Sequence, residues 1–391
     1  MAARLPRTVV ALGFVSLFMD FSSEMIHGLL PLFLTGTLGA SVAMVGLIEG
    51  LGEAVAQIVK VFSGAISDRF GRRKPLIVLG YGLAALTKPV FAMAGAPATV
   101  LAARLADRLG KGIRGAPRDA LVADLVPEDR RGAAYGLRQS MDTIGAVLGP
   151  LAAMALMLAS GGDIRRVFAL AILPAAAALA ILLMAVREPP AANTSPPHAG
   201  GPRFNRAALG RLGRPFHAVV ALGVALTLAR LTEAFLILRI AGLGLAPAFA
   251  PLALVALSAV YALVAWPAGA LSDRIGRRHL LTLSLGVLVL AHLALSLANG
   301  LPAAFLGLVL WGLHMGLSQG LLSAEIARTV PAELRGTGFG LFNLATGLAT
   351  LVAGAGAGLF WSGIGPAATF GIGAGLAFLA MCLAAAARLR G

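Results

Sequence analysis

Long apolar segments alternate with short polar segments along the whole chain. Most apolar segments reach or exceed ~20 residues, the length of helix that crosses the hydrocarbon core of a bilayer. There are twelve of them, and we therefore predict twelve transmembrane helices. The predicted spans lie near residues 7–34, 42–66, 75–95, 98–122, 132–159, 166–186, 217–241, 248–271, 280–298, 301–325, 336–361 and 366–387.

Composition favours the same class of protein. Of the 391 residues, 58% are hydrophobic and only 13% are charged, and the mean hydropathy is +0.87. A soluble chain of this length could not bury so much apolar surface, whereas membrane spans expose it to lipid. The one cysteine, Cys382, excludes an intramolecular disulfide framework and a cysteine metal cluster. We predict an all-α membrane protein without a metal or a cofactor.

The net charge of +15 is distributed according to membrane topology, so we expect no nucleic-acid partner. Basic residues gather in alternate loops, such as 69–74, 130–131, 187–214 and 274–278, whereas the loops near 36–41, 94–98, 243–247, 299–302 and 363–366 are uncharged. Only Asp163, Arg165 and Arg166 depart from this pattern. The positive-inside rule predicts that the basic loops and both termini are cytoplasmic, in a multi-pass protein of the inner (plasma) membrane. We expect no cleavable signal, because Arg4 and Arg7 lead directly into an apolar segment too long for a signal core.

The two halves of the chain repeat each other. The hairpin sequence GAISDRFGRRK at 64–74 returns as GALSDRIGRR at 269–278, VVALG at 9–13 returns at 219–223, and RGAAYGL at 131–137 returns as RGTGFGL at 335–341. These offsets of 204 to 210 residues indicate a parallel repeat of six spans. We therefore expect a bundle at 1–187, a cytoplasmic linker rich in proline and glycine at 188–215, and a second bundle at 216–391.

These motifs resemble those of the major facilitator superfamily over essentially the whole chain. The duplicated hairpin is similar to the family signature between helices two and three, and Arg108 followed by Gly112 is similar to its fourth-helix motif. Gly145, Gly149 and Pro150 resemble a fifth-helix motif typical of the antiporter branches, although Ala153 and Met154 stand where a glycine pair normally follows. The resemblance implies two pseudo-symmetric six-helix bundles that transport a solute by alternating access, and no enzymatic activity.

The charged hairpins are candidates for a gate. Interfacial arginines that set topology and contact lipid phosphate would explain the basic residues but not the aspartate. An aspartate at a helix end can instead cap a helix and pair with arginine, so that these contacts hold the cytoplasmic side shut until they break. The predicted gating residues are Gly64, Asp68, Arg69, Gly71, Arg72, Arg73, Gly269, Asp273, Arg274, Gly276, Arg277 and Arg278.

Ionisable side chains inside the membrane are the second set of candidates, because each costs at least ~2.5 kcal/mol at the centre of a span. The fourth span carries five of them at spacings of 3, 4, 3 and 4, which places Arg104, Asp107, Lys111, Arg114 and Arg118 on one stripe. Either the stripe lines a cavity that attracts anions or it ties helices together through ion pairs. We favour the cavity for Arg104, Arg108 and Arg114, and ion pairs for Arg118 and Asp119.

Further polar groups are expected along the same pathway. As a hypothesis, Asp20 or Glu24 with Arg108 couples proton entry to substrate exit, as comparable residues do in the antiporters that the chain resembles. Trp311, His314 and Ser318 share one face and are candidates for substrate contact. The predicted pathway residues are Asp20, Glu24, Glu49, Glu53, Arg104, Asp107, Arg108, Lys111, Arg114, Asp142, Arg230, Glu233 and His314.

An enzyme is disfavoured, because the sequence has no phosphate-binding loop, paired metal ligands or nucleophile elbow. A receptor or structural protein would have no reason to keep so many buried charges. The leading hypothesis is a proton-coupled exporter of a small organic compound or drug. The alternative is an importer or exchanger of organic anions, including metal chelates. We expect protons, a small molecule and lipid as partners, and a monomer; the substrate does not follow from fold or motifs.

Overall fold

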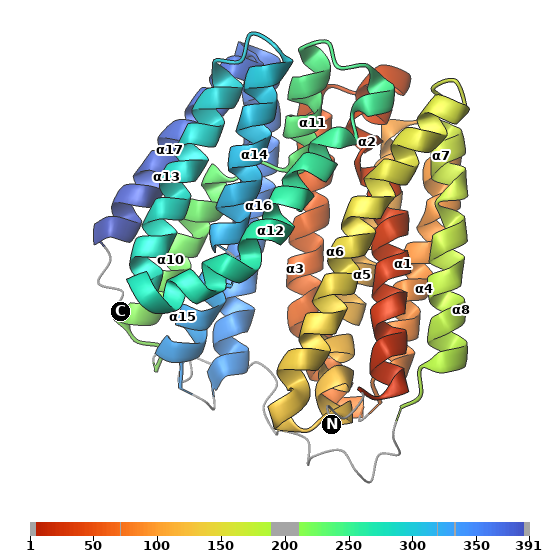
Figure 1. Ribbon diagram of the computed structural model, residues 1–391, viewed down its shortest axis with the longest axis vertical. Helices are drawn as coiled ribbons and strands as arrows, with labels where there is room; N and C mark the ends of the chain where they lie inside the picture. Colours follow the sequence, from red (N-terminus) through yellow and green to blue (C-terminus); the bar gives the residue numbers. More distant parts are fainter. Residues whose placement is uncertain (1–4, 71, 189–210, 319, 332–333, 387–391) are drawn as a thin grey trace. The chain divides into compact units, whose positions relative to one another are not determined.

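A computed structural model describes residues 5–70, 72–188, 211–318, 320–331 and 334–386, without the side chains of Phe70, Trp266, Ala270 and residues 272–274. All regular structure in these residues is helical (Figure 1). The first half contains α1 (Arg7–His27), α2 (Leu30–Leu32), a π-helical turn (Phe33–Thr37), α3 (Val42–Phe70), α4 (Lys74–Met93), α5 (Pro97–Leu125), α6 (Glu128–Ala159), α7 (Ile164–Leu170) and α8 (Ile172–Ala185).

The second half is built in the same way. It contains α10 (Arg214–Ala229), α11 (Glu233–Gly242), a 3₁₀ turn (Pro247–Phe249), α12 (Leu252–Ile275), α13 (Arg277–Ser296), α14 (Leu301–Ser318), α15 (Leu321–Thr329), α16 (Arg335–Ile364) and α17 (Pro366–Ala386). Within the described residues, 11 helical stretches are long and apolar enough to cross a membrane. The remaining predicted span is α5, whose many charges keep it out of that count. The predicted all-α membrane fold is confirmed.

Two spans of the second half are interrupted near their middle. α10 ends at Ala229 and α11 begins at Glu233, so the chain is not helical at 230–232. Between α14 and α15, Gly320 takes φ +73°, a left-handed conformation that suits glycine. Such breaks are tolerated inside a membrane where protein groups or a cavity satisfy the freed backbone. Here His292 of α13 binds the Ala229 carbonyl through Nε2 at 2.9 Å.

The exceptional charges Asp163, Arg165 and Arg166, at the start of α7, have a local structural role. The Asp163 side chain caps the helix by accepting from the Arg166 backbone N–H at 3.2 Å. Arg165 donates to the Ala92 carbonyl at the end of α4, at 2.8 Å. These residues therefore depart from the loop pattern because they fix helix ends.

The chain divides by contacts into two compact units, Met1–Leu29 with Val55–Gly201, and Leu30–Ala54 with Pro202–Gly391. Residues 30–54 thus belong with the second unit, because the start of α3 packs tightly on α16. A Cβ on Gly354 would lie 2.6 Å from the Gly46 carbonyl oxygen, and one on Gly358 would lie 2.8 Å from the Ala43 Cα. The expected boundaries at 1–187 and 216–391 follow the sequence repeat and not these contacts. Residues 189–210 of the linker expected at 188–215 lie outside the described residues.

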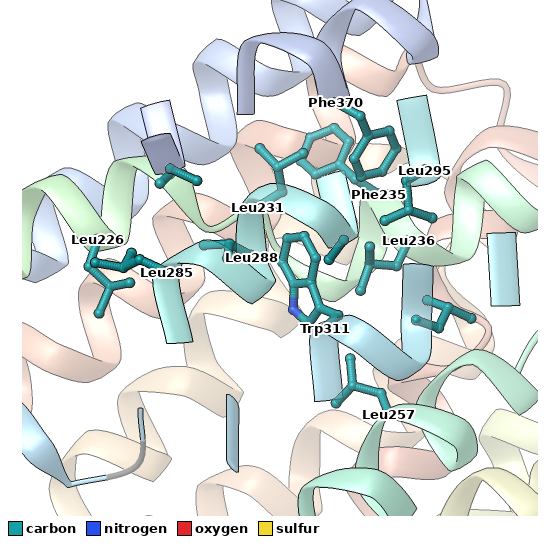
Figure 2. Packing of buried hydrophobic residues seen from close by; sticks show 14 of the residues in the cluster. Leu226, Leu231, Phe235, Leu236, Leu257, Leu285, Leu288, Leu295, Trp311 and Phe370 are labelled. Atoms are coloured by element: carbon teal, nitrogen blue, oxygen red, sulfur yellow. The ribbon is translucent and has the colours of Figure 1, made fainter. Parts of the chain in front are cut away.

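Each unit has its own apolar core. In the first unit the core includes Leu12, Met19, Tyr81 and Leu182. In the second, Figure 2 shows the Trp311 indole among leucines that include Leu231, Leu257 and Leu288. The buried polar groups described below lie within these packed helices.

Candidate functional site

The polar stripe of α5 is largely buried within the first unit. Arg104, Asp107, Arg108 and Arg114 are each at most 6% exposed, whereas Lys111 is exposed. Pro97 begins the helix, where its missing N–H costs no hydrogen bond. The stripe therefore faces protein over most of its length, as its cost in lipid requires.

His27, at the end of α1, is where two of these arginines meet. Arg104 contacts Nε2 of its imidazole, and Arg108 Nη2 lies 2.7 Å from the same nitrogen. Guanidinium groups only donate hydrogen bonds, so Nε2 must present its lone pair. The ring proton is then on Nδ1, which lies 3.2 Å from Glu24 Oε1 and donates to it. His27 is thus a neutral acceptor held between two cations and a carboxylate.

His27 is not among the predicted pathway residues, although it shares a face of the first span with Asp20 and Glu24. A lone histidine near the end of a span is an ambiguous signal. Its spacing of three residues from Glu24 was the clue, because residues three apart on a helix are neighbours.

Lys88 is a second residue that the prediction missed. It lies in α4, is 1% exposed, and its Nζ lies 3.1 Å from both Asp107 Oδ1 and Ser23 Oγ. The close approach of α4 to α5 makes this possible, since a Cβ on Gly80 would lie 2.5 Å from the Gly110 carbonyl oxygen. An ionisable residue within an apolar span was the available signal.

The half of the stripe toward the C-terminal end of α5 forms a different network. The Arg114 guanidinium lies 4.5 Å from the centre of the Tyr81 ring, and its Nη1 is buried without a hydrogen-bond partner in the described part of the chain. Arg118 donates to Ser16 Oγ at 3.0 Å and pairs with Asp119 at 3.3 Å. The ion-pair role expected for Arg118 and Asp119 therefore has geometric support.

Asp142 of α6 also lies among charges. Arg138 Nη1 is 2.5 Å from Asp142 Oδ2, and Arg138 Nε is 3.8 Å from Asp119 Oδ1. Asp142 and Lys111 both act electrostatically on Asp20, whose carboxylate makes no hydrogen bond or ion pair with a described residue. Asp20 is therefore a carboxylate without a fixed partner beside a chain of ion pairs.

The glycines of the fifth-helix motif place α1 against α6. A Cβ on Gly145 would lie 2.5 Å from the Leu17 carbonyl oxygen, and one on Gly149 would lie 2.6 Å from that of Phe21. Pro150 is buried in the same helix. These close contacts fix the depth of the face of α1 that carries Asp20 and Glu24.

The hypothesis that joins Asp20 or Glu24 to Arg108 stays a prediction. The structure puts His27 between Glu24 and Arg108. Glu49 and Glu53 lie in the part of α3 that belongs to the second unit, and Glu49 is buried there.

The second unit holds the candidates of the C-terminal half. Arg230 is the first residue of the break between α10 and α11, and Glu233 is the first residue of α11. His314 Nδ1 lies 2.9 Å from the Ser284 carbonyl, while His314 Nε2 and Trp311 Nε1 are buried without partners in the described residues. Ser318 donates to the His314 carbonyl at 2.9 Å, so its hydroxyl is used within the helix.

Arg73 is the centre of the first charged hairpin. It lies 2.7 Å from Asp68 and 2.7 Å from Asp124 at the end of α5. Burial opposes the charged form, but hydrogen bonds to Asp124 and Asp68 outweigh it and raise the pKa of Arg73. Arg69 and Arg72 are both exposed, and Gly71 lies outside the described residues. A Cβ on Gly64 would lie 3.3 Å from the Ala116 Cβ.

The same hairpin is held to the end of α8 by a reciprocal contact. Glu188 accepts from the backbone N–H of Arg73 and, at 3.2 Å, from that of Lys74. Lys74 Nζ donates to the Val186 carbonyl at 2.7 Å. A carboxylate thus lies at one helix N-terminus and an ammonium at the other helix's C-terminus, as their dipoles favour.

The second hairpin is described only in part. Gly276, the N-cap residue just before α13, has φ +81°, which explains a glycine at that position of the motif. Arg277 lies 3.3 Å from the buried Glu325, which Arg328 also binds at 2.7 Å, and Arg278 donates to the Ala385 carbonyl. The side chains of Asp273 and Arg274 lie outside the described residues, and Gly269 is in α12.

No described residues gather three or more histidine, cysteine, aspartate or glutamate side chains that could hold a metal ion. The site thus consists of buried arginine, lysine and histidine with a few carboxylates. Such side chains can form charge-assisted hydrogen bonds with anionic groups.

The sequence profile of the Major Facilitator Superfamily matches residues 12–240 and 218–390. The chain belongs to this superfamily. As a member, it is a secondary transporter in a lipid bilayer that binds small molecules, and it is not an enzyme. The membership of this superfamily that the duplicated hairpin predicts is confirmed.

Some relatives match this superfamily member over nearly its full length, and others match only part of it. It is 30% identical over 381 residues to "Uncharacterized MFS-type transporter MJ1317" of Methanocaldococcus jannaschii, covering 96% of this chain and 93% of that one. It is 36% identical to the multidrug resistance protein MdtH of Yersinia enterocolitica over 147 residues, covering 38% of this chain and 34% of that one. The fold also matches the solved structure of a POT family transporter with a bound thioalcohol-conjugated peptide, at TM-score 0.80. The match covers 97% of this chain and 95% of that transporter, with 14% identity, and this likeness shows the fold.

Proposed function

We propose that this chain transports a small organic anion by alternating access, moving it together with protons. The observation that carries the proposal is the convergence of Arg104 and Arg108 on the lone pair of His27. Arg114 adds a buried guanidinium nitrogen without a hydrogen-bond partner in the described residues. Arginine forms charge-assisted, often bidentate hydrogen bonds with carboxylate, sulfonate and phosphate groups, so this stripe has the chemistry of an anion site.

Electrostatics favours co-transport of the anion with protons over exchange of the anion for protons. A proton on His27 Nε2 would face two guanidinium donors, which repel it. A substrate oxyanion between the ring and the arginines would accept from all three groups and favour that proton. Binding of the anion and of the proton then reinforce each other, and linkage makes this effect reciprocal. Of the two hypotheses drawn from the sequence, the organic-anion alternative is therefore favoured.

The test uses the purified chain in proteoliposomes with radiolabelled benzenesulfonate, whose charge does not change with pH. Accumulation driven by an acidic exterior, and abolished when the proton gradient is collapsed, is the expected result. Benzenesulfonamide, the uncharged analogue, is expected to compete poorly. If benzenesulfonate is neither bound nor transported, the organic-anion proposal is wrong.

Proton-coupled export of a drug is the second candidate. The observation in its favour is the match to multidrug resistance proteins of Yersinia species, which covers little more than a third of this chain at most. An antiporter moves its substrate against the proton flux, so substrate would accumulate when the vesicle interior is acidic. The same assay therefore separates the two candidates by the sign of the gradient that drives uptake.

A further inference from the structure

Resting on the proposed anion site, we propose that Lys88 is a positioning residue that sets its affinity and charge preference. Nothing in the superfamily motifs carried by this sequence involves Lys88. By binding Asp107, Lys88 keeps that carboxylate from acting as an internal competitor for the arginines on either side of it. The geometry of α1, α4 and α5 carries this inference.

Asp107 lies on α5 between the two arginines that contact His27. It is three residues after Arg104, a spacing at which an aspartate and an arginine form a pair on one helix face. It is also adjacent to Arg108, and both arginines act on its carboxylate electrostatically. Without another partner, Asp107 would turn to these arginines.

In the structure the Asp107 carboxylate pairs instead with Lys88. Lys88 Nζ lies 3.1 Å from Asp107 Oδ1, and this is the ion pair that Asp107 makes within the described residues. The two side chains are 1% and 7% exposed, so water does not screen the pair. Breaking one partner of a buried pair leaves an uncompensated charge, which seeks the nearest opposite charge.

Ser23 fixes the direction of the lysine. Its hydroxyl accepts from Lys88 Nζ at 3.1 Å, and Ser23 lies four residues before His27 on α1. The ammonium is therefore held between α1 and α5, one helical turn away from the imidazole. This arrangement leaves Arg104 and Arg108 directed at His27, where we place the substrate anion.

The consequence is that the two partners of this ion pair have opposite effects on anion binding. Replacing Lys88 by Met removes one positive charge and frees a competing carboxylate, so affinity falls. Replacing Asp107 by Asn removes the negative charge and leaves Lys88 to attract the anion, so affinity rises. A pair that only ties α4 to α5 would instead lower affinity, or leave it unchanged, in both variants.

The experiment measures binding of benzenesulfonate and of the dianion benzene-1,3-disulfonate to the full chain in detergent by calorimetry. We expect Lys88→Met to weaken binding on the order of tenfold, and more for the dianion. Asp107→Asn is expected to tighten binding about threefold or more, and the double variant to return within about threefold of the native chain. Lys88→Arg, which keeps the charge, is expected to retain most of the affinity.

The matched control is Lys60→Met. Lys60 is an exposed lysine of α3 for which the described residues provide no ion pair, so its loss leaves no unpaired carboxylate. If the native chain binds neither sulfonate, the anion function fails and this inference fails with it. If the native chain binds them but Lys88→Met and Asp107→Asn shift affinity in the same direction, the role of Lys88 is wrong while the anion function stands.

Discussion

At the scale of single residues, His27 connects a carboxylate of its own helix with two arginines of α5, which lie far apart in the sequence. Its Nδ1 is 3.2 Å from Glu24, and its Nε2 faces both Arg104 and Arg108. The imidazole therefore borders the place, between its ring and the arginines, where we expect a substrate oxygen to bind. It can also accept the proton that accompanies the anion, so binding and coupling involve the same atom.

The substitution His27→Ala separates these two roles. It removes the proton acceptor but leaves both arginines, so we expect exchange of internal for external benzenesulfonate to persist. Accumulation driven by a proton gradient is expected to fall at least ~tenfold, which corresponds to losing ~1.4 kcal/mol of coupling. Counterflow and gradient-driven uptake in the same proteoliposomes provide the measurement. Equal loss of both activities would show that His27 has no separate part in coupling.

At the scale of elements, glycines determine how closely the helices approach. Gly145 and Gly149 allow α6 to contact the backbone of α1, and Gly80 and Gly110 do the same for α4 and α5. Lipid tails are as apolar as leucine, so the hydrophobic effect does not drive helices together inside a membrane. Close packing of this kind is then a main source of helix association. The charged side chains meet because these helices touch.

Alanine substitutions in α6 test this role. Gly149→Ala would place a Cβ 2.6 Å from the Phe21 carbonyl oxygen, so we expect it to destabilise the chain by about 1–3 kcal/mol. Gly136 lies in the same helix, and no atom lies within 4 Å of its added Cβ. Gly136→Ala is therefore expected to raise stability by about 0.5–1 kcal/mol. Thermal unfolding in detergent measures both variants, and a similar shift in both would contradict the packing argument.

At the scale of the whole molecule, the charge pattern of the loops predicts the topology. The basic hairpin around Arg73 and the start of α6 are expected in the cytoplasm, and the uncharged turn before α3 outside. We also propose that the Arg73 contacts to Asp68 and Asp124 hold the cytoplasmic side closed, and that the chain acts as a monomer. Alternating access requires the cytoplasmic side to open and close during each transport cycle, and in this proposal the Arg73 contacts break when it opens.

Single cysteines test the topology. Cys382 is exposed and is first replaced by Ser. In right-side-out vesicles, a maleimide that cannot cross the membrane is expected to label Ser41→Cys and to spare Asp129→Cys, both of which replace exposed residues. Inverted vesicles are expected to give the opposite result. If both cysteines are labelled from the same side, the assigned orientation is wrong.

The sequence by itself determined the class of fold, because apolar runs of bilayer length permit only membrane-spanning helices and a duplicated hairpin requires two related halves. It also located the stripe from Arg104 to Arg118, since charges in an apolar span are visible without a structure. Only the tertiary structure decided which charges meet. Lys88 binds Asp107 because Gly80 and Gly110 bring α4 against α5, and His27 of α1 receives two arginines of α5. Helical periodicity fixes neighbours along one helix, whereas partners on different helices depend on crossing points and depths that no local pattern encodes.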